Sequence, residues 1–198
     1  TLKIKSIKKI ILATTNSKNN KIYKKILEKY NIQYFYGSSN NLIDRTIKCS
    51  DQFKFDYFLR VCGDRPFFSH LYIQNLLLKL NRKKNIPYEF VSNNKKNKLV
   101  DQGLTVEIIS SKLLKNLNQK KIFNNYQLEN ISSYYYENFN KFNILYVKSP
   151  KNWFLKNKYT VDNIQDLIKM KKIIFKVGYH SFNIQKANHF IKKLNYEN

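Results

Sequence analysis

The segment Phe58–Phe68 reads FLRVCGDRPFF, and its order of residues predicts the fold class of the chain. An apolar run ends at Gly63, one of only four glycines, and Asp64 follows directly. Pro66 then removes a backbone donor and fixes φ, so an ordinary strand cannot continue through it. The segment therefore predicts a buried strand that stops abruptly and presents Asp64 at its carboxyl end.

The neighbouring segments alternate between short apolar runs and stretches in which apolar residues recur at helical spacing. Strands are expected at 7–15 and 32–37, and helices at 16–31, 38–53 and 69–84. This alternation predicts an α/β fold whose crossovers place the strand carboxyl ends along one edge of a sheet. Ligands bind outside that edge in such sheets, and both Gly37 and Asp64 are expected there.

Composition argues against several classes of protein. The 198 residues suffice for one domain with its own core, and an apolar content of 42% is too high for a disordered chain. No window has the roughly 18 uncharged apolar residues of a membrane span, and lysines interrupt the first apolar stretch, which argues against a signal peptide. Cys49 and Cys62 have no zinc-site spacing. We therefore expect a cytoplasmic protein without a membrane partner, a zinc site or a disulfide framework.

The formal net charge of +24 would suit a phosphate-rich partner, either a nucleic acid or an anionic membrane surface. Drift in an AT-rich coding sequence is the favoured explanation, because only four of the 37 basic residues are arginine and the lysines are spread along the chain. A nucleic-acid-binding protein would gather arginines and aromatic residues in one stripe. Nucleic acid is therefore not the expected partner, and the informative cations are the arginines Arg45, Arg60, Arg65 and Arg82.

Five motifs follow one another between Ile10 and Leu167. They are YFYGSSNNLIDR (34–45), FLRVCGDRPFF (58–68), FVSNN (90–94) with DQGLTVEIISSKLL (101–114), LENISSYYYEN (128–138) and KYTVDNIQDL (158–167). In order and spacing they resemble the cytidylyltransferases that activate acidic sugars. The resemblance is to the acylneuraminate and CMP-Kdo synthetase-like enzymes, in particular the branch of spore coat polysaccharide biosynthesis.

The resemblance implies a Rossmann-like nucleotidyltransferase fold, a three-layer α/β sandwich with a mostly parallel sheet, as one domain over residues 1–198. It also implies transfer of CMP from CTP to a sugar acid with release of pyrophosphate, and Mg²⁺ held by Asp64 and Asp162. Mg²⁺ is usually bound by one or two carboxylates together with substrate phosphates and water. The alternatives are a turn-forming role for Asp64 and a helix N-cap role for Asp162.

The same motifs supply further candidates by position. The resemblance assigns nucleotide contacts to Gly37, Asp44, Arg45 and Arg60, and sugar contacts to Ser92, Asn93, Gly103, Glu107 and Glu129. Structural roles remain open as alternatives: a tight turn at Gly37, a helical surface pair at Asp44 and Arg45, a sheet-edge salt bridge at Arg60, and a solvent-facing strand position at Glu107.

The sequence also departs from the family pattern. No segment of it resembles the family's first strand and phosphate-binding loop, ARMGSSRLPGK. We therefore expect an N-terminally truncated domain, either a fragment or a decayed copy that has lost its triphosphate site. Asn40 and Asn41 replace two acids, Asn130 replaces a histidine and Thr105 replaces an aspartate. This chain alone is not expected to be active.

Three further functions stay open beside a truncated or decayed cytidylyltransferase. A non-catalytic module would bind sugar or nucleotide without releasing pyrophosphate. A basic nucleic-acid-binding protein is less favoured, and a glycosyltransferase would need an Asp-x-Asp metal motif that GDR does not supply. The resemblance also implies a possible homodimer through the segment 128–138, although its aromatic run Tyr134–Tyr136 is equally suited to a core.

Overall fold

The structure of the chain is a computed structural model that describes residues 7–16, 21–82, 88–95, 100–150, 153–178 and 183–196. The strands are β1 (Ile11–Thr15), β2 (Gln33–Gly37), β3 (Tyr57–Arg60), β4 (Phe90–Ser92), β5 (Glu107–Ser110) and β6 (Ile144–Tyr146). The α-helices are α1 (Lys21–Lys29), α2 (Leu42–Phe53), α3 (His70–Arg82), α4 (Ser111–Gln119), α5 (Asn125–Glu129), α6 (Ile131–Glu137), α7 (Ile164–Val177) and α8 (Ile184–Tyr196). A short 3₁₀ helix, η2, spans Phe139–Lys141.

The larger sheet has the order β3-β5-β4-β6 and is mixed. β4 and β6 are parallel, whereas β5 runs antiparallel to both β3 and β4. The prediction of a mostly parallel sheet is therefore wrong. β5 begins at the edge of the sheet where β4 ends. To run parallel to β4, the chain would first have to cross back to the opposite edge through a long connection. Without that crossover, β5 runs antiparallel to β4.

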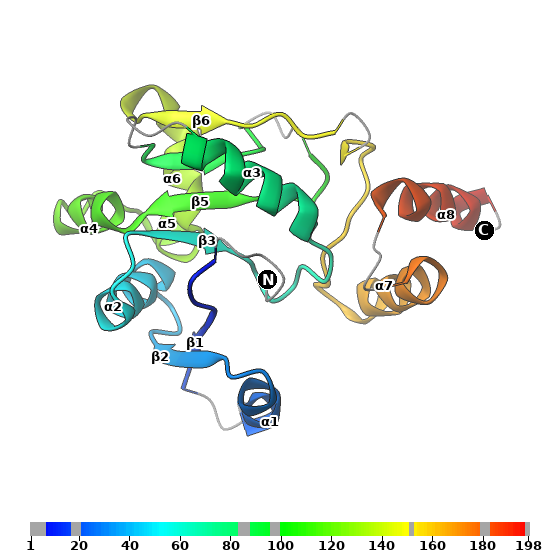
Figure 1. Cartoon of the computed structure of the whole chain (residues 1–198), viewed down its shortest axis with the longest axis horizontal. Coiled ribbons are helices and arrows are strands. Elements are labelled where there is room, and N and C mark those ends of the chain that lie inside the picture. Colours follow the sequence, from blue (N-terminus) through cyan, green and yellow to red (C-terminus); the bar gives the residue numbers. More distant parts are fainter. Residues whose placement is uncertain are drawn as a thin grey trace.

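The first two strands form a sheet of their own. β1 and β2 are parallel, with Thr15 opposite Gly37 at the carboxyl end. Helix α2 packs against both of these strands and against α4 and α5, so it joins the small sheet to the rest of the molecule. Figure 1 shows β1 and β2 lying apart from β3, with α2 beside them.

Helices cover both faces of the four-stranded sheet (Figure 1). Phe90 and Ile109 belong to a core with residues of α4 and α6, whereas Val91 and Ile108 belong to a core with Ile73 and Leu76 of α3. Adjacent residues of a strand point to opposite faces, which is why each strand contributes to both cores. The register of both strands with β5 places the carboxyl ends of β3 and β4 at one level, because Arg60 and Ser92 are both opposite Glu107.

A third core joins the carboxyl-terminal helices to the sheet edge. Trp153 and Tyr159 pack with Met170 and Ile173 of α7 and with Ile191 of α8. The run KYTV (158–161) predicts a strand from its sequence, but it forms only one bridge, between Lys158 and Gln102. The chain then turns into the N-cap of α7 at Asn163. In the described part of the chain no helix is long and apolar enough to cross a bilayer.

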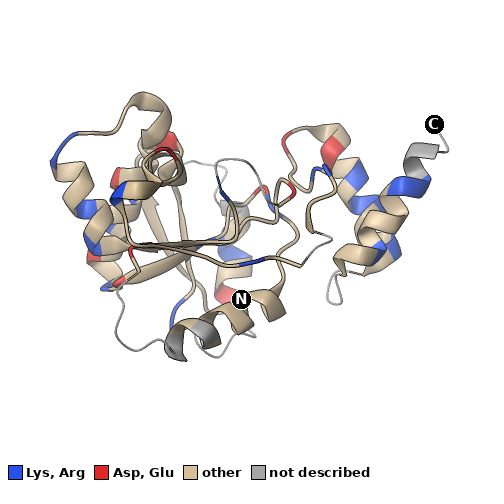
Figure 2. Ribbon diagram, turned by 90° about the horizontal axis from the view of Figure 1, so that it is seen from above, with Lys and Arg blue, Asp and Glu red and all other residues tan. Residues whose placement is uncertain are grey.

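Basic residues are distributed over several elements. Figure 2 shows lysine and arginine on helices at both ends of the molecule, including α7 and α8, with acidic residues between them. The basic residues therefore lie on several elements rather than along a single one (Figure 2).

Candidate functional site

Three candidate residues lie side by side in one row across the sheet. Arg60 is opposite Glu107 in the pairing of β3 with β5, and Ser92 is opposite the same Glu107 in the pairing of β4 with β5. Arg60 and Ser92 are the last residues of their strands, and Glu107 is the first of its strand. The row therefore lies at the edge where ligands bind in α/β proteins.

Hydrogen bonds connect this row to helix α6. Arg60 and Glu107 form an ion pair at 3.4 Å, and the side chain of Glu107 is only 4% exposed, against 20% for Arg60. The Tyr136 hydroxyl donates to Oε1 of Glu107 at 2.9 Å and lies 2.8 Å from Oγ of Ser92. Arg60 also donates to Oγ of Ser132 at 3.4 Å. Glu107 is thus a buried network residue rather than a solvent-facing one.

Asn93 follows Ser92, and its side chain has a structural role beside this row. Its amide nitrogen donates to the carbonyl of Leu104 at 3.1 Å and to Oγ of Ser149 at 3.0 Å, and its amide oxygen accepts from the backbone of Val106 at 2.7 Å. The residue is 2% exposed. It holds the segment before β5 in place and has little surface to offer a ligand.

Gly37 allows Arg45 to pack closely against the end of β2. A Cβ atom on Gly37 would lie 2.6 Å from Cγ of Arg45 and 2.9 Å from Cε1 of Phe35, which is closer than real side chains approach. Arg45 donates to the carbonyl of Ser38 at 2.9 Å. The guanidinium is thereby held against the loop between β2 and α2.

The positive charges of Arg45 and Arg60 influence each other. Burial lowers the pKa of Arg45, and the nearby positive charge of Arg60 lowers it further. Nε of Arg45 is buried and has no hydrogen-bond partner among the described residues. Two guanidinium groups whose charges repel each other suit an anion. Asp44, by contrast, pairs with Lys48 at 2.9 Å on the surface of α2.

The two candidate metal ligands lie on adjacent loops. The backbone amide of Val161 donates to the carbonyl oxygen of Asp64 at 2.9 Å, so the loop after β3 is tied to the residue directly before Asp162. Oδ2 of Asp162 accepts from Oγ1 of Thr160 at 3.2 Å, and Thr160 is 2% exposed. The Asp162 side chain itself is 48% exposed.

Lys158 forms ion pairs with the carboxylates of Asp162 and Asp166. Its ammonium lies 2.8 Å from Oδ2 of Asp162 and also contacts Oδ2 of Asp166. Hydrogen bonds to Asp162 and then Asp166 raise the pKa of Lys158, and the bond from Lys158 is the main cause that lowers the pKa of Asp166. Asp162 is not the N-cap of α7, because Asn163 caps the helix by accepting from Asp166 at 2.9 Å.

The donor set of these loops fits Mg²⁺. Two carboxylates on neighbouring loops match an ion that takes one or two protein carboxylates and completes its shell with substrate phosphates and water. The described residues contain no group of three or more histidine, cysteine or acidic side chains that could hold a metal by themselves.

Residues 1–193 match the family model described as cytidylyltransferase. The chain belongs to the cytidylyltransferase family. It is 30% identical over 174 residues to an uncharacterized protein of Methanocaldococcus jannaschii, an alignment that covers 83% of this chain and 65% of the relative. The cytidylyltransferase chain thus spans a little under two thirds of that protein's length.

Solved structures agree with this membership. A cytidylyltransferase from Leptospira borgpetersenii serovar Hardjo-bovis matches with a TM-score of 0.79 and 25% identity, over 94% of this chain and 76% of that one. A 4-diphosphocytidyl-2C-methyl-D-erythritol synthase from Anaerococcus prevotii matches with a TM-score of 0.57 and 18% identity, over 88% and 82% of the two chains. The second likeness concerns the fold alone.

Two remaining candidates of this cytidylyltransferase chain lie outside the row. Gly103 has φ +95°, and a Cβ there would lie 2.5 Å from the carbonyl oxygen of Tyr159. It therefore joins the 100–104 loop to the segment before Asp162 as a packing residue. Glu129 ends α5 and is exposed, and within the described residues no hydrogen bond or ion pair connects it with Arg60 or Glu107.

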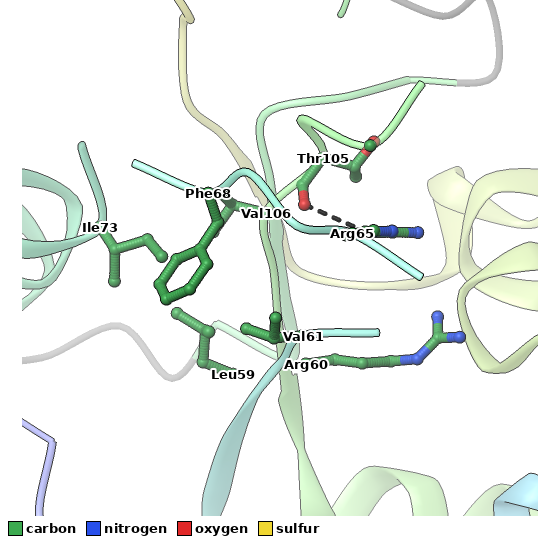
Figure 3. A pocket seen from close by; sticks show the side chains of 9 residues that line it. Leu59, Arg60, Val61, Arg65, Phe68, Ile73, Thr105 and Val106 are labelled. Atoms are coloured by element: carbon green, nitrogen blue, oxygen red, sulfur yellow. Dashed lines mark hydrogen bonds between the residues drawn. The ribbon is translucent and has the colours of Figure 1, made fainter. Parts of the chain in front are cut away.

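The strand before Asp64 separates an apolar side from a basic side. In Figure 3 the side chains of Leu59, Phe68 and Ile73 lie together, whereas Arg60 and Arg65 extend away from them. The enclosed pocket has a volume of about 10 Å³, room for no more than a water molecule. This pocket is therefore too small for a nucleotide or a sugar.

Sequence reasoning missed Tyr136, Ser132 and Lys158. The spacing of four residues between Ser132 and Tyr136 is a signal that both face the same side of a helix. The run Tyr134–Tyr136 hid it, because Tyr135 is a true core residue that stacks on Phe90 with ring centroids 4.8 Å apart. For Lys158 no spacing rule gives a cue, because residues 158–162 lie before α7 and are not helical.

Proposed function

We propose that this protein transfers CMP from CTP to a sugar acid, with release of pyrophosphate, as a member of the branch that activates sugars for surface polysaccharides. The observation that carries the proposal is the hydrogen bond between Val161 and the carbonyl of Asp64, at 2.9 Å. It ties together the backbones of two loops that carry carboxylates from distant parts of the chain. Nucleotidyl transfer needs such a pair, because charge builds up on the α-phosphate and on the departing pyrophosphate.

Asp64 and Asp162 are the residues that would hold Mg²⁺. When bound, the ion would neutralise phosphate charge at the reacting centre. The protein's own part is to keep both carboxylates on backbone-linked loops, so that the loops stay in place while the Asp162 carboxylate exchanges Lys158 for the ion.

Arg45 and Arg60 are proposed to bind the anionic groups of the substrates. Guanidinium groups bind phosphate and carboxylate through paired N–H donors, and an anion between them would relieve the repulsion that lowers the pKa of Arg45. Ser92 and Glu107 would border the sugar, with Glu129 at the rim. Asn93, Gly37 and Gly103 would act by shaping the walls around it, since their surroundings are closely packed.

The test is release of pyrophosphate from CTP by the protein purified from its source cell, with Mg²⁺ and a panel of sugar acids. Turnover with CTP and one acid, and none with ATP or with a neutral sugar, is the expected result. Tight binding of CTP without pyrophosphate release for any acid would overturn the proposal of catalysis.

A second candidate function is a non-catalytic module that binds a sugar or a nucleotide. The ion pair of Lys158 with Asp162 favours it, because that carboxylate already has a cationic partner. Asn41 points the same way, since it stands where the resembling enzymes have an acid and here caps α2 by accepting from Asp44 at 2.8 Å. The binding module predicts saturable CMP or sugar binding that Mg²⁺ leaves unchanged.

A further inference from the structure

The network around Glu107 has a fixed direction of donation. A carboxylate paired with Arg60 can only accept, so the Tyr136 hydroxyl must give its proton to Oε1 of Glu107. Tyr136 then accepts from Ser92, whose Oγ lies 2.8 Å away. Oγ of Ser92 in turn accepts from the backbone amide of Asn94 at 3.0 Å. The hydroxyl groups of Tyr136 and Ser92 therefore each donate one hydrogen bond and accept one within this network.

Tyr136 is well suited to be a permanent donor. Burial raises the pKa of its hydroxyl well above the ordinary range, and the charge of Glu107 raises it further. The ring is fixed against Phe90, with ring centroids 5.4 Å apart and an edge-to-face angle of 79°. The hydroxyl is therefore both protonated and held in place on α6.

Arg60 is the member of the network that reaches the surface. Its side chain is 20% exposed, and only the donors on Nη1 contact Glu107 and Ser132, both at 3.4 Å. These contacts are long, so the direction of the guanidinium depends on where the Glu107 carboxylate is held. Within the network, Tyr136 supplies Glu107 with its short hydrogen bond, at 2.9 Å.

We propose that Tyr136 is a positioning residue that acts through Glu107 to aim the Arg60 guanidinium at the anion site beside Arg45. The inference rests on the proposed function for the identity of the anion, which is a phosphate or carboxylate group of a substrate. The aiming of Arg60 is a property of the chain itself. Without the hydroxyl, the Glu107 carboxylate would turn toward other donors and Arg60 would lose its single orientation.

The low number of arginines makes this directly measurable. With only four arginines in the chain, ¹⁵N labelling of arginine gives four side-chain Nε–H signals, and replacing Arg60 by lysine assigns its own. A restrained guanidinium also shows separate Nη–H signals, whereas a freely rotating one does not. We expect separate Nη–H signals for Arg60 in the wild-type chain and their loss in Tyr136→Phe.

Two further variants make the test specific. Tyr126→Phe removes a hydroxyl from a side chain that is 63% exposed and should leave the Arg60 signals unchanged. Glu107→Gln should also remove the separate Nη–H signals of Arg60. Adding Tyr136→Phe to Glu107→Gln should have no further effect, because Tyr136 acts on Arg60 through Glu107. Should Tyr136→Phe fail to fold, Ser92→Ala removes the donor on the other side of the hydroxyl and should broaden the same Arg60 signals.

Titration with CMP separates this inference from the proposed function. Wild-type chain should shift the Arg45 and Arg60 signals on CMP addition, and Tyr136→Phe should weaken the apparent affinity about tenfold, the loss expected when a hydrogen bond to a charged group is removed. If CMP leaves the wild-type signals unchanged, while Tyr136→Phe still loses the separate Nη–H signals of Arg60, the proposed function alone is overturned. Unchanged Arg60 signals in folded Tyr136→Phe would overturn the positioning role.

Discussion

The carbonyl oxygen of Asp64 accepts a hydrogen bond from the backbone amide of Val161, at 2.9 Å. This contact fixes the separation of the loops that carry Asp64 and Asp162, and it uses no side-chain atom of either residue. The carboxylates can therefore be altered one at a time while the backbone frame that holds them persists.

Asp64→Asn should abolish Mg²⁺-dependent pyrophosphate release from CTP in the protein expressed in its own host, while the thermal unfolding temperature stays within a few degrees of wild type. An amide keeps the size of the carboxylate but removes the charge that a hard cation requires. The matched control is Asp56→Asn, at the exposed opposite end of β3. Normal turnover by Asp64→Asn would remove Asp64 from the metal site.

Lys158→Met should raise the affinity of the chain for Mn²⁺ in the presence of CTP, measured by the loss of the free Mn²⁺ electron paramagnetic resonance signal. The ammonium at 2.8 Å from Asp162 competes with a metal ion for the same oxygen. Because solvent screens this exposed pair, the expected gain is a modest increase in affinity. Lys171→Met, on the exposed side of α7, is the control. Equal Mn²⁺ affinities in both variants and wild type would show that Asp162 does not bind the ion.

Gly103→Ala should lower the free energy of unfolding by about 2 kcal/mol or more in urea denaturation. The substitution places a Cβ 2.5 Å from the carbonyl of Tyr159 and forces alanine to adopt φ +95°. Gly63→Ala is the matched control, because no atom lies within 4 Å of its added Cβ. That variant should change the free energy of unfolding by no more than about 0.5 kcal/mol. The reverse order of the two losses would contradict the packing role of Gly103.

Asp101→Asn should remove one component of the pH dependence of stability. Burial raises the pKa of Asp101 above its unfolded value of 3.8, against backbone hydrogen bonds from Leu155 and its neighbours that lower it. The folded chain then holds more protons than the unfolded chain between these two pKa values, so stability falls as pH rises through that window. Relative to wild type, the unfolding free energy of the variant should therefore rise as the pH increases from 4 to 7. Parallel stability curves would argue against a raised pKa.

The sequence predicts the order of elements well and the direction of one strand poorly. The apolar run before Gly63 is β3, and the expected helices at 38–53 and 69–84 correspond to α2 and α3. The run LTVEIIS predicts a strand, now β5, but an apolar run reads the same for either strand direction. Its antiparallel pairing with β3 and β4 depends on where the chain re-enters the sheet, which is a long-range property.

Sequence motifs predict some residues of the candidate site, whereas others are found only from contacts in the structure. Arg60, Ser92 and Glu107 could be selected from motifs, and the structure places them in one cross-strand row. Tyr136 could not be selected, because a run of tyrosines predicts burial and gives no sign of which ring turns its hydroxyl toward a carboxylate. That choice is made by the rotation of α6 against the sheet.

The separate pairing of β1 with β2 has a consequence for amide hydrogen exchange. Two paired strands alone are marginal, so the amides of β2 should exchange through local opening sooner than those of β5, which is paired on both sides. Arg45 lies in α2 against the end of β2, whereas Arg60 ends β3. An anion that bridges the two guanidinium groups would connect the labile unit to the protected one. Ligand binding should then be visible as slower exchange in β2, a strand that contributes no charged side chain of its own to the site.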